Sequence, residues 1–353
     1  MFFLRRSKPP LLGVDISSTS VKVVELAQSG ANLQLNAYAI VALPAEETQG
    51  KDQSRIQIVG AAIRKAIRQM GSRLTRGITA VPSSAVIIKT VVFPATLRED
   101  DIEAQIELEA EQYIPYPLED VSLDFCALGA SSRSPGLVDV QVVASRKEHV
   151  EDRAAALEWA GLKAEIVDVE SFAMMRACDR IYAGLPDGRP EDAYAVIDAG
   201  AANTSLIVIE KGQVIFTRDQ TFGGQLLSQE IQRRFGGSLE EAERLKRFGE
   251  LPDGYETEVL VPFTEALNQQ IERSLHFFRS SQPQVTLKRI FLSGGCAPLA
   301  AIDLLQGSLL ETPIIKVEPF TGMLVNPRAA RANLNQDAPA LLVATGLALR
   351  GFD

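Results

Sequence analysis

Two stretches of the sequence have the same pattern of residues. Residues 11–26 read LLGVDISSTSVKVVEL and residues 194–209 read YAVIDAGAANTSLIVI. Each is an apolar segment ending in Asp, followed by a turn of small and hydroxyl residues and by a second β-branched segment, which is typical of two strands joined by a tight turn. A Gly-bearing turn leads each pair into a third strand, and helical patterns follow at 55–70 and 224–235. Two such units predict a duplicated α/β domain with a cleft between the copies.

The length of the chain and a Gly- and Pro-rich stretch near its middle support this division into two units. A chain of 353 residues is too long for one ordinary compact domain. The Gly- and Pro-rich stretch 184–190 is a linker signal. We therefore expect a first lobe over residues 1–190 and a second lobe over residues 191–353.

Each lobe is predicted to carry an additional subdomain. Residues from about 84 to 164 look inserted in the first lobe, with a helix opened by a Thr96–Glu99 capping box and a second helix over about 147–160. This pattern predicts a small α+β subdomain. In the second lobe, Ser238 and Glu241 repeat the capping-box spacing and open a highly charged helix, within a small helical/β subdomain over about 236–285.

Bulk composition excludes several classes of protein. A formal net charge of -9 without a basic cluster disfavours binding to nucleic acid, because phosphates would repel the chain. Three scattered cysteines and two histidines form neither a disulfide framework nor a zinc site, which fits a reducing compartment. No apolar run approaches the roughly 18 residues of a membrane helix. We expect a cytoplasmic chain that meets the membrane through partners, with Met1–Arg6 a frayed end or a weak membrane-surface contact.

The first turn has side chains suited to a magnesium-bound triphosphate. Its backbone N–H groups can approach phosphates closely. Lys22, on the next strand, can reach a phosphate as a point charge, and Asp15 can hold hydrated Mg²⁺. Further hydroxyl donors are Ser17, Ser18, Thr19 and Ser20. Taken alone, this turn is also explained by an ordinary Ser/Thr-rich hairpin.

Two later elements favour the phosphate interpretation. In the second copy, Asp198 can hold the same Mg²⁺ through water. The residues that could grip the phosphates from that side are Gly200, Asn203 and Thr204. A strand over 288–292 then runs into Ser293, Gly294 and Gly295, where glycine lets an adenosine approach the backbone. A lone Gly-Gly pair is usually a turn, but the three elements together predict one ATP and one Mg²⁺ held between the lobes.

The order of these three elements resembles the actin-like ATPases, which include actin, sugar kinases, heat-shock chaperones and the division protein FtsA. The resemblance implies a duplicated ribonuclease H-like fold with two lobes around a nucleotide cleft. The stretch from Phe222 to Lys246 is similar to that of FtsA and its bacterial relatives. It implies that Gly223, Gly224, Glu243 and Lys246 lie near the nucleotide, with Glu243 and Lys246 approaching the ribose and base. The alternative for Glu243 is a surface ion pair with Arg247.

Residues 13–22 and 109–119 resemble, more closely still, the PilM-like family of type IV pilus assembly proteins. The resemblance covers essentially the whole chain. It implies an ATP-binding adaptor beneath the inner membrane that serves twitching motility and captures the N-terminal cytoplasmic tail of PilN, in a groove between the first-lobe core and the inserted subdomain. Residues expected near this groove are Tyr113, Ile114, Pro115 and Tyr116; the alternative is that they form the subdomain's own core. Pilus motor ATPases, the platform protein and self-association stay open as further contacts.

The resemblance leaves enzymatic activity open. Hydrolysis requires a group that positions water beside the γ-phosphate, and Glu170 falls where relatives have a Glu-Pro-x-Ala segment, although Ser171 here replaces the Pro. We expect ATP binding with slow hydrolysis at most. The alternatives are a sugar or small-molecule kinase, for which residues 81–83 offer no clear catalytic carboxylate, and an FtsA-like filament-forming protein, whose amphipathic C-terminal helix we do not expect here.

Overall fold

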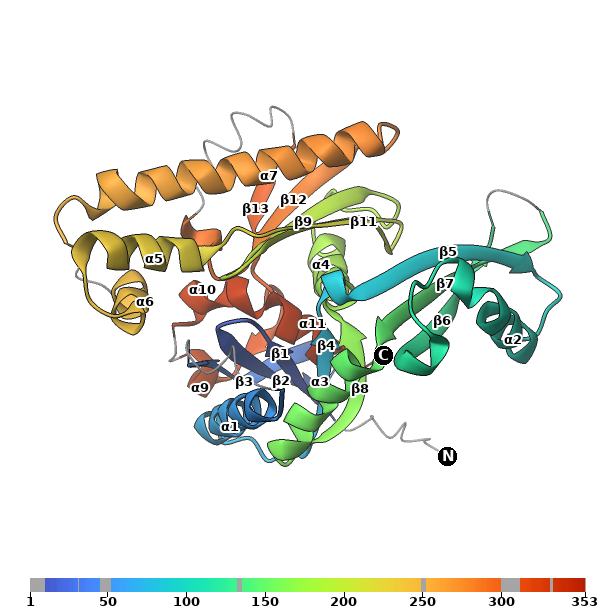
Figure 1. Ribbon diagram of the computed structural model, residues 1–353, viewed down its shortest axis with the longest axis horizontal. Helices are drawn as coiled ribbons and strands as arrows, with labels where there is room; N and C mark the ends of the chain where they lie inside the picture. The colour runs from blue at the N-terminus through green and yellow to red at the C-terminus, as the bar shows by residue number, and fades with distance from the viewer. Residues whose placement is uncertain are drawn as a thin grey trace.

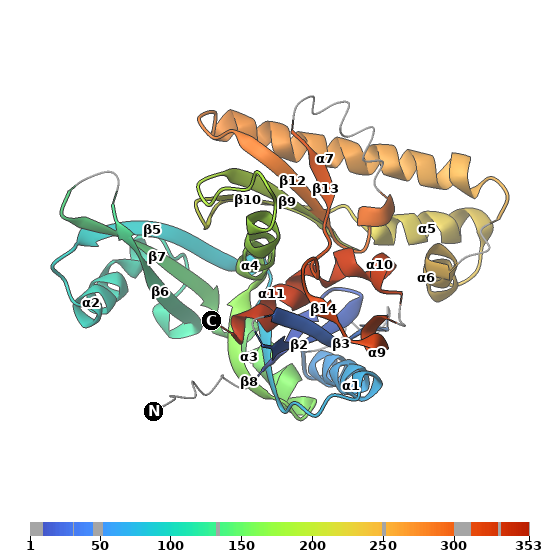
Figure 2. The same ribbon diagram turned by 180° about the vertical axis from the view of Figure 1, so that it is seen from behind.

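The computed structural model describes residues 10–30, 32–44, 52–131, 135–248, 252–299, 312–330 and 333–352. Figures 1 and 2 show two stacked lobes with a smaller subdomain projecting to one side. The start at Met1–Arg6 and the helix expected after Pro298 fall on residues outside these ranges. Within the described part of the chain, no helix combines the length and the apolar character needed to cross a membrane.

The first lobe is built on a six-stranded sheet with the order β14-β3-β2-β1-β4-β8. Strands β1, β2 and β3 are antiparallel neighbours, and β4 and β8 extend the sheet in parallel. The strands are β1 (Leu12–Ile16), β2 (Ser20–Ser29), β3 (Asn32–Ala42), β4 (Arg76–Val81), β8 (Lys163–Val169) and β14 (Leu324–Val325). Strand β1 is buried along its whole length, as a central strand covered on both faces should be.

The second lobe repeats this arrangement in a five-stranded sheet with the order β11-β10-β9-β12-β13. Here too, three antiparallel strands are followed by two parallel ones. The strands are β9 (Ala193–Ala199), β10 (Thr204–Glu210), β11 (Gln213–Gln220), β12 (Leu287–Ser293) and β13 (Ile314–Lys316). The duplication predicted from the sequence is therefore present in the strand pairing itself.

Two helices lie between the sheets and join the lobes into one core. They are α4 (Glu170–Ala183) and α11 (Leu342–Arg350), and their buried residues share one hydrophobic cluster with β2, β9 and β12. A Cβ atom at Gly346 would lie 1.8 Å from the Ala173 carbonyl oxygen, so the two backbones can meet only because this residue is glycine. Since α11 and β14 pack on first-lobe strands, the end of the expected second lobe (191–353) returns to the first lobe.

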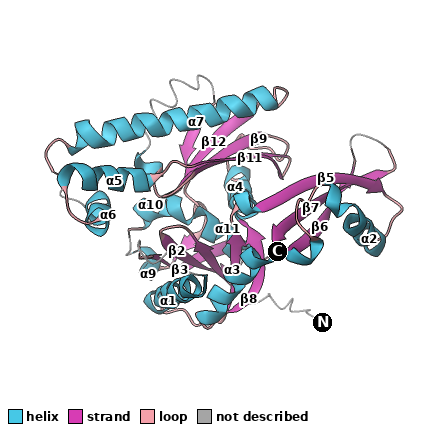
Figure 3. Ribbon diagram, viewed as in Figure 1, coloured by secondary structure: helices cyan, strands magenta, loops and turns pink. Residues whose placement is uncertain are grey.

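Helices also cover the outer face of each sheet (Figure 3). On the first lobe these are α1 (Asp52–Met70) and α3 (Lys147–Trp159), and on the second α7 (Val261–Ser281). Helices α5 (Gly224–Phe235) and α6 (Leu239–Phe248) pack against each other beyond the end of this sheet. The capping box that opens α6 is confirmed: Glu241 N donates to Ser238 Oγ at 3.1 Å and Ser238 N to Glu241 Oε2 at 2.7 Å. The described residues of 236–285 form helices and turns without a strand, so the expected β component of that subdomain was wrong.

The inserted subdomain consists of a three-stranded sheet, β5-β7-β6, with helix α2 against it. The elements are α2 (Glu99–Glu109), β5 (Val86–Pro94), β6 (Val121–Ala130) and β7 (Leu137–Arg146). Helix α2 begins after Arg98, whose N–H donates to Asp101 Oδ2 at 3.4 Å, so the predicted Thr96–Glu99 box was wrong. Helix α3, expected as the subdomain's second helix, packs mainly on α1, β4 and β8 of the first lobe, with smaller contacts to β6 and β7 of the subdomain.

Shorter elements complete the connections. The single-turn helices are η2 (Ser83–Ala85), η3 (Ala110–Gln112), η4 (Leu118–Asp120), η5 (Glu256–Leu260), η6 (Ala297–Leu299), α9 (Pro327–Ala330), α10 (Leu334–Asp337) and η7 (Ala338–Leu341). Helix η2 leads from β4 into the inserted subdomain, and η3 and η4 frame the segment that was expected near the partner groove.

Candidate functional site

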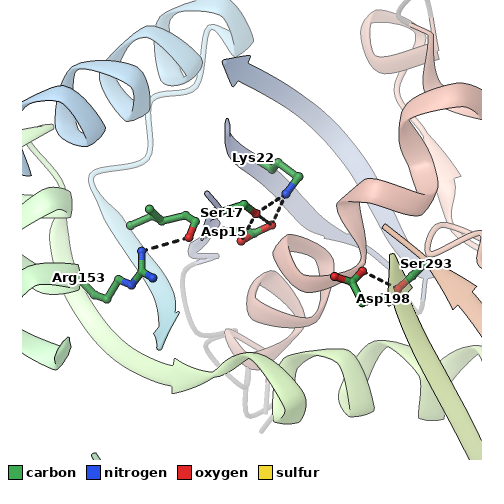
Figure 4. Close-up of polar contacts among 7 residues, drawn as sticks. Asp15, Ser17, Lys22, Arg153, Asp198 and Ser293 are labelled. Carbon is green, nitrogen blue, oxygen red and sulfur yellow. Dashed lines mark hydrogen bonds and ion pairs between the residues drawn. The ribbon is translucent and has the colours of Figure 1, made fainter. Parts of the chain in front are cut away.

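The acidic turn of the first lobe is held together by its own side chains. Asp15 lies at the end of β1 and Lys22 directly opposite it on β2, because the antiparallel register pairs these two residues. Lys22 Nζ donates to Asp15 Oδ2 at 2.8 Å and to Ser17 Oγ at 2.5 Å, and Ser17 Oγ donates to Asp15 Oδ1 at 3.0 Å (Figure 4). The predicted first-turn residues Asp15, Ser17 and Lys22 therefore form one compact cluster.

Lys22 keeps its positive charge in this cluster. Burial by itself favours the neutral amine, but the Asp15 carboxylate raises the pKa of Lys22 above its ordinary value, with Asp198 and Glu170 adding to the effect. The influence of Asp198 shows that the second lobe lies within electrostatic reach of Lys22. A buried ammonium near the cleft is suited to binding an anion.

Asp198 ends strand β9, as Asp15 ends β1. Its Oδ1 accepts a hydrogen bond from Ser293 Oγ at 2.7 Å, which joins two of the predicted elements. Burial raises the pKa of Asp198, and the Asp15 carboxylate acts in the same direction, while Ser293 and Lys22 oppose the rise. Figure 4 shows the Asp198–Ser293 pair to one side of the Asp15–Ser17–Lys22 cluster, separate from it. The two acidic residues thus lie close enough for the Asp15 carboxylate to influence Asp198.

Glu170 is the first residue of α4 and belongs to the same electrostatic group. Burial, followed by the Asp15 carboxylate, raises its pKa to about 8, and Asp198 contributes further. Arg153 and Lys22 act against this rise. Glu170, predicted as the water-positioning residue, therefore lies near both acidic strand ends.

Arg153 is a site residue that the sequence did not reveal. It projects from α3, and its Nη1 donates to the carbonyl oxygen of Ile16 at 3.1 Å (Figure 4). Burial lowers the pKa of Arg153, and the carboxylates of Glu170 and Asp15 oppose that shift. Because α3 was expected to belong to the inserted subdomain, its cation was not placed at the cleft. The 11–26 turn alone contains no signal for it.

The glycine loops of the second lobe form one continuous surface. Gly224 N donates to Gly200 O at 3.0 Å and Cys296 N to Ala199 O at 2.9 Å. Gly294 has a φ of +94°, and a Cβ there would lie 2.3 Å from Ala199 O, so only glycine fits. A Cβ at Gly295 would meet no atom within 4 Å, which leaves that backbone open. The three predicted loops around residues 200, 224 and 294 are therefore brought together.

Helix α6 adds a polar cluster beside this surface. Lys246 Nζ donates to Gly224 O at 3.1 Å, to Ser228 Oγ at 2.8 Å and to Glu243 Oε1 at 2.8 Å. Glu243 and Lys246, predicted to approach the ribose and base, thus lie next to the loop of Gly223 and Gly224. Ser228, which the sequence did not single out, joins both charged side chains to α5.

The other predicted turn residues shape the two turns. Thr204 Oγ1 donates to Phe222 O at 2.8 Å and so ties the second turn to the Gly223–Gly224 loop. Asn203 closes the same turn through its carbonyl oxygen, which accepts from Gly200 N at 2.9 Å. In the first turn, the carbonyl oxygen of Ser20 accepts from Ser17 N at 3.0 Å and that of Thr19 from Leu43 N at 2.8 Å. Ser18 is exposed at the tip.

These residues fit a magnesium-bound triphosphate. In the described part of the chain, no group of three or more His, Cys, Asp or Glu side chains is placed to hold a metal ion directly. Besides burial, the carboxylates of Asp15 and Asp198 nevertheless raise the pKa of Glu170, and the Asp15 carboxylate raises that of Asp198. A hydrated divalent cation, which keeps most of its water ligands, would relieve this crowding without direct coordination. Lys22 and Arg153 supply positive charge for phosphates.

A separate cavity of about 160 Å³ lies where the inserted subdomain joins the first lobe. Ile114 and Tyr116 line it, together with the start of β5 and the end of β7. Tyr116 is 44% exposed, and the Arg146 guanidinium lies 5.7 Å from its ring centroid. Tyr113 instead donates its hydroxyl to Ile106 O at 3.1 Å inside the subdomain, and Pro115 is exposed. The predicted partner segment is therefore divided between the subdomain core and the cavity.

Comparison with known proteins agrees with this architecture. A family model described as type IV pilus assembly protein PilM matches residues 13–352. A chain of a PilM-PilN type IV pilus biogenesis complex is similar with a TM-score of 0.80 and 29% identity, over 98% of this chain and 99% of that one. The ethanolamine utilization protein EutJ from Carboxydothermus hydrogenoformans has a TM-score of 0.54 and 19% identity, over 97% and 90% of the two chains, a likeness of fold alone. The predicted two-lobed actin-like ATPase fold is confirmed.

Proposed function

The chain belongs to the PilM family of type IV pilus assembly proteins, and from this premise we propose that it is an ATP-binding adaptor that captures the N-terminal cytoplasmic tail of PilN. One observation carries the nucleotide part of the proposal. Two acidic strand ends from duplicated units face one cleft, and Lys22 is near enough to both for each carboxylate to raise its pKa. A structural role does not require two carboxylates and a buried ammonium to share a cleft.

The proposed nucleotide is held by both lobes. Lys22 and Arg153 meet the phosphates, and the loop of Gly294 and Gly295, whose backbone is open at Gly295, accommodates the adenosine, with Glu243 and Lys246 beside the ribose. Asp15 and Asp198 hold Mg²⁺ through its water ligands. When bound, Mg²⁺ neutralises charge on the phosphates and orients them. The acidic crowding around Glu170 is consistent with a site that is completed by a divalent cation.

Hydrolysis by this site is proposed to be slow at most. Glu170 is placed at the start of α4 to orient a water, but its pKa of about 8 means that it is mostly protonated at neutral pH. A protonated carboxyl group cannot accept a proton from water. Glu170 can act as a base only when a bound cation lowers its pKa, so we assign the chain a binding role first.

Isothermal titration calorimetry tests nucleotide binding directly. We expect ATP to bind in the presence of Mg²⁺ and more weakly in EDTA. Asp15→Ala and Asp198→Ala should each weaken binding about tenfold or more, the loss of one charge-assisted contact. Asp253→Ala, at an exposed acidic residue of the second lobe, is the matched control. Unchanged affinity in both cleft variants would remove the site assignment.

The partner part of the proposal places the PilN tail at the cavity between the inserted subdomain and the first lobe. Extended peptides are captured in grooves that combine apolar pockets with backbone partners, and this cavity has apolar walls beside the edge strand β5. Through PilN, the chain would associate with the inner membrane as a peripheral protein. The similarity to a chain of a PilM-PilN complex supports this assignment.

A fluorescein-labelled peptide of the PilN N-terminal tail tests the partner assignment by anisotropy. We expect saturable binding by the wild-type chain and a loss of about tenfold for Tyr116→Ala, because exposed aromatic residues often dominate such contacts. Phe277→Ala removes a similarly exposed aromatic ring, 49% exposed, on α7 and should change nothing. Equal weakening by both variants, or no saturable binding, would contradict the assignment.

A further inference from the structure

One side chain of the cavity has a buried atom with no partner. His149 lies in the first turn of α3 and lines the cavity with Ile114 and Tyr116. Its Nδ1 atom is buried, and no described residue forms a hydrogen bond with it. Buried polar atoms in folded proteins are almost always paired, so each exception calls for a specific explanation. An explanation here is a ligand that enters the cavity.

The surroundings of His149 indicate which kind of group would pair with it. Its other ring nitrogen, Nε2, faces Glu148 Oε1 at 3.7 Å. In the neutral imidazole, a proton on Nε2 is stabilised by this carboxylate, and Nδ1 is then left as a hydrogen-bond acceptor. An acceptor buried in a cavity recognises a donor, and in a peptide that donor is an amide N–H.

Two other polar side chains that line the cavity, Ser145 and Arg146, already have partners. Ser145 Oγ donates to Ala85 O at 2.9 Å, and Arg146 Nη1 pairs with Glu148 Oε1 at 2.8 Å while its guanidinium lies near the Tyr116 ring. The remaining wall is apolar and includes Val86, Ile87 and Ala144. The cavity thus combines the unpaired Nδ1 of His149 with apolar surface, which suits an amide next to an apolar side chain.

We propose that His149 fixes the register of the captured peptide: its Nδ1 accepts a hydrogen bond from an amide N–H of the PilN tail, while a neighbouring apolar side chain fills the cavity. This inference rests on the proposed function, because it takes the cavity to be the PilN site. It makes His149 a specificity-determining residue. Its position at the start of α3 is fixed by packing of that helix on α1 and β8.

Two substitutions separate hydrogen bonding from shape. His149→Asn keeps an acceptor oxygen near the place of Nδ1, whereas His149→Leu removes the acceptor at similar bulk. With the labelled PilN tail, we expect His149→Leu to bind about tenfold more weakly and His149→Asn to stay within about threefold of wild type. Thermal unfolding and Mg·ATP titration should be unchanged in both, because neither the core nor the cleft is altered.

The peptide side of the contact is tested with the same assay. One series of peptides is N-methylated at successive backbone amides, and a second replaces each Asn or Gln side chain by an isosteric ester or Leu. One modification should weaken binding to wild type about tenfold yet have little effect on His149→Leu, the signature of a direct pair. If this modification is an N-methylated amide, the donor is a backbone N–H; if it is a replaced Asn or Gln, the donor is a side chain.

The outcomes separate the two claims. If wild type does not bind the PilN tail, the proposed function fails and this inference fails with it. If wild type binds and His149→Leu binds equally well, only the inference is overturned. Binding that is weakened equally in His149→Asn and His149→Leu would also overturn it, because shape rather than the acceptor would then decide affinity.

Discussion

The two copies of the duplicated unit have the same strand pairing but different charges. In the first copy, Asp15 lies opposite Lys22 across β1 and β2. In the second copy, Asp198 lies opposite Ser205 across β9 and β10, in the same register. Asp15 is therefore neutralised within its own lobe, whereas among the described residues Asp198 receives a hydrogen bond from Ser293 and the cation that lowers its pKa is Lys22 of the first lobe.

This difference shows how a symmetrical backbone can make an asymmetrical site. The first lobe supplies a buried ammonium that favours anions, and the second supplies a carboxylate whose charge its own lobe does not balance. A magnesium-bound triphosphate carries both kinds of charge and matches both lobes at once. Each of the following predictions tests whether this division of charge between the lobes is real.

The largest expected effect concerns Glu170, which lies near both copies. Its pKa of about 8 exceeds the usual value, so between about pH 4.5 and 8 the folded chain holds a proton that the unfolded chain releases. Stability should therefore fall as pH rises through this window, by on the order of 2–4 kcal/mol, and level off above it. Glu170→Gln should remove this slope in urea unfolding followed at pH 5.5, 7 and 8.5. If stability depends on pH in the same way in wild type and Glu170→Gln, the carboxylates of the two copies do not act together on Glu170.

The next effect concerns Lys22 and Ser205, which occupy the same position of the strand pair in the two copies. Lys22→Ala should weaken Mg·ATP binding by about tenfold to a hundredfold, the loss of a charge-assisted contact. Ser205→Ala, the same position in the second copy, should change affinity less than twofold. Calorimetric titration of both variants measures the contrast directly. Similar losses at both positions would mean that the cation is not what distinguishes the copies.

A smaller effect, on the free energy of unfolding, has opposite signs for substitution of Asp15 and of Asp198. Asp15→Asn leaves Lys22 without its anion and should lower stability by about 2 kcal/mol at pH 7. Asp198→Asn removes a carboxylate whose pKa is raised by burial, so stability should rise by about 1 kcal/mol. Guanidinium unfolding of both variants without nucleotide provides the comparison. Loss of stability in both would show that Asp198 is balanced within its own lobe.

The smallest effect concerns the cation contributed by α3. Arg153→Met keeps much of the side-chain packing but removes the charge beside Ile16 O. We expect Mg·ATP affinity to fall about threefold to tenfold and the affinity for adenosine to be unchanged, because only the phosphates would contact this residue. Competition titrations with ATP and adenosine separate the two. An equal loss for both ligands would indicate a change in the shape of the site instead.

The sequence predicts the parts of the molecule that local patterns determine. Both acidic turns, the strands on either side and the Ser238–Glu241 capping box depend on residues close together in the chain, and the structure has them where they were expected. The Thr96–Glu99 box failed because Asp101 offers a carboxylate two residues further on, and the helix starts at Glu99 instead. Competing caps of similar quality are not separated by sequence alone.

Long-range packing accounts for what the sequence did not predict. The contact of Arg153 with Ile16 joins residues 137 positions apart, and it depends on α3 covering the first-lobe sheet rather than the subdomain. Likewise, β14 and α11 return from the second half of the chain to the first lobe. The apolar face of α3 fits either the subdomain or the first-lobe sheet, because burial favours both alike. Only the three-dimensional arrangement decides between them.

The central claim is that both lobes hold the same nucleotide, and titration of Mg·ATP into Asp198→Asn tests it most directly. The predicted result is one nucleotide per wild-type chain and an affinity about tenfold weaker in the variant, although the variant is at least as stable as wild type. If Asp198→Asn binds Mg·ATP as tightly as wild type, the second lobe has no part in the site and the account of a shared cleft is contradicted.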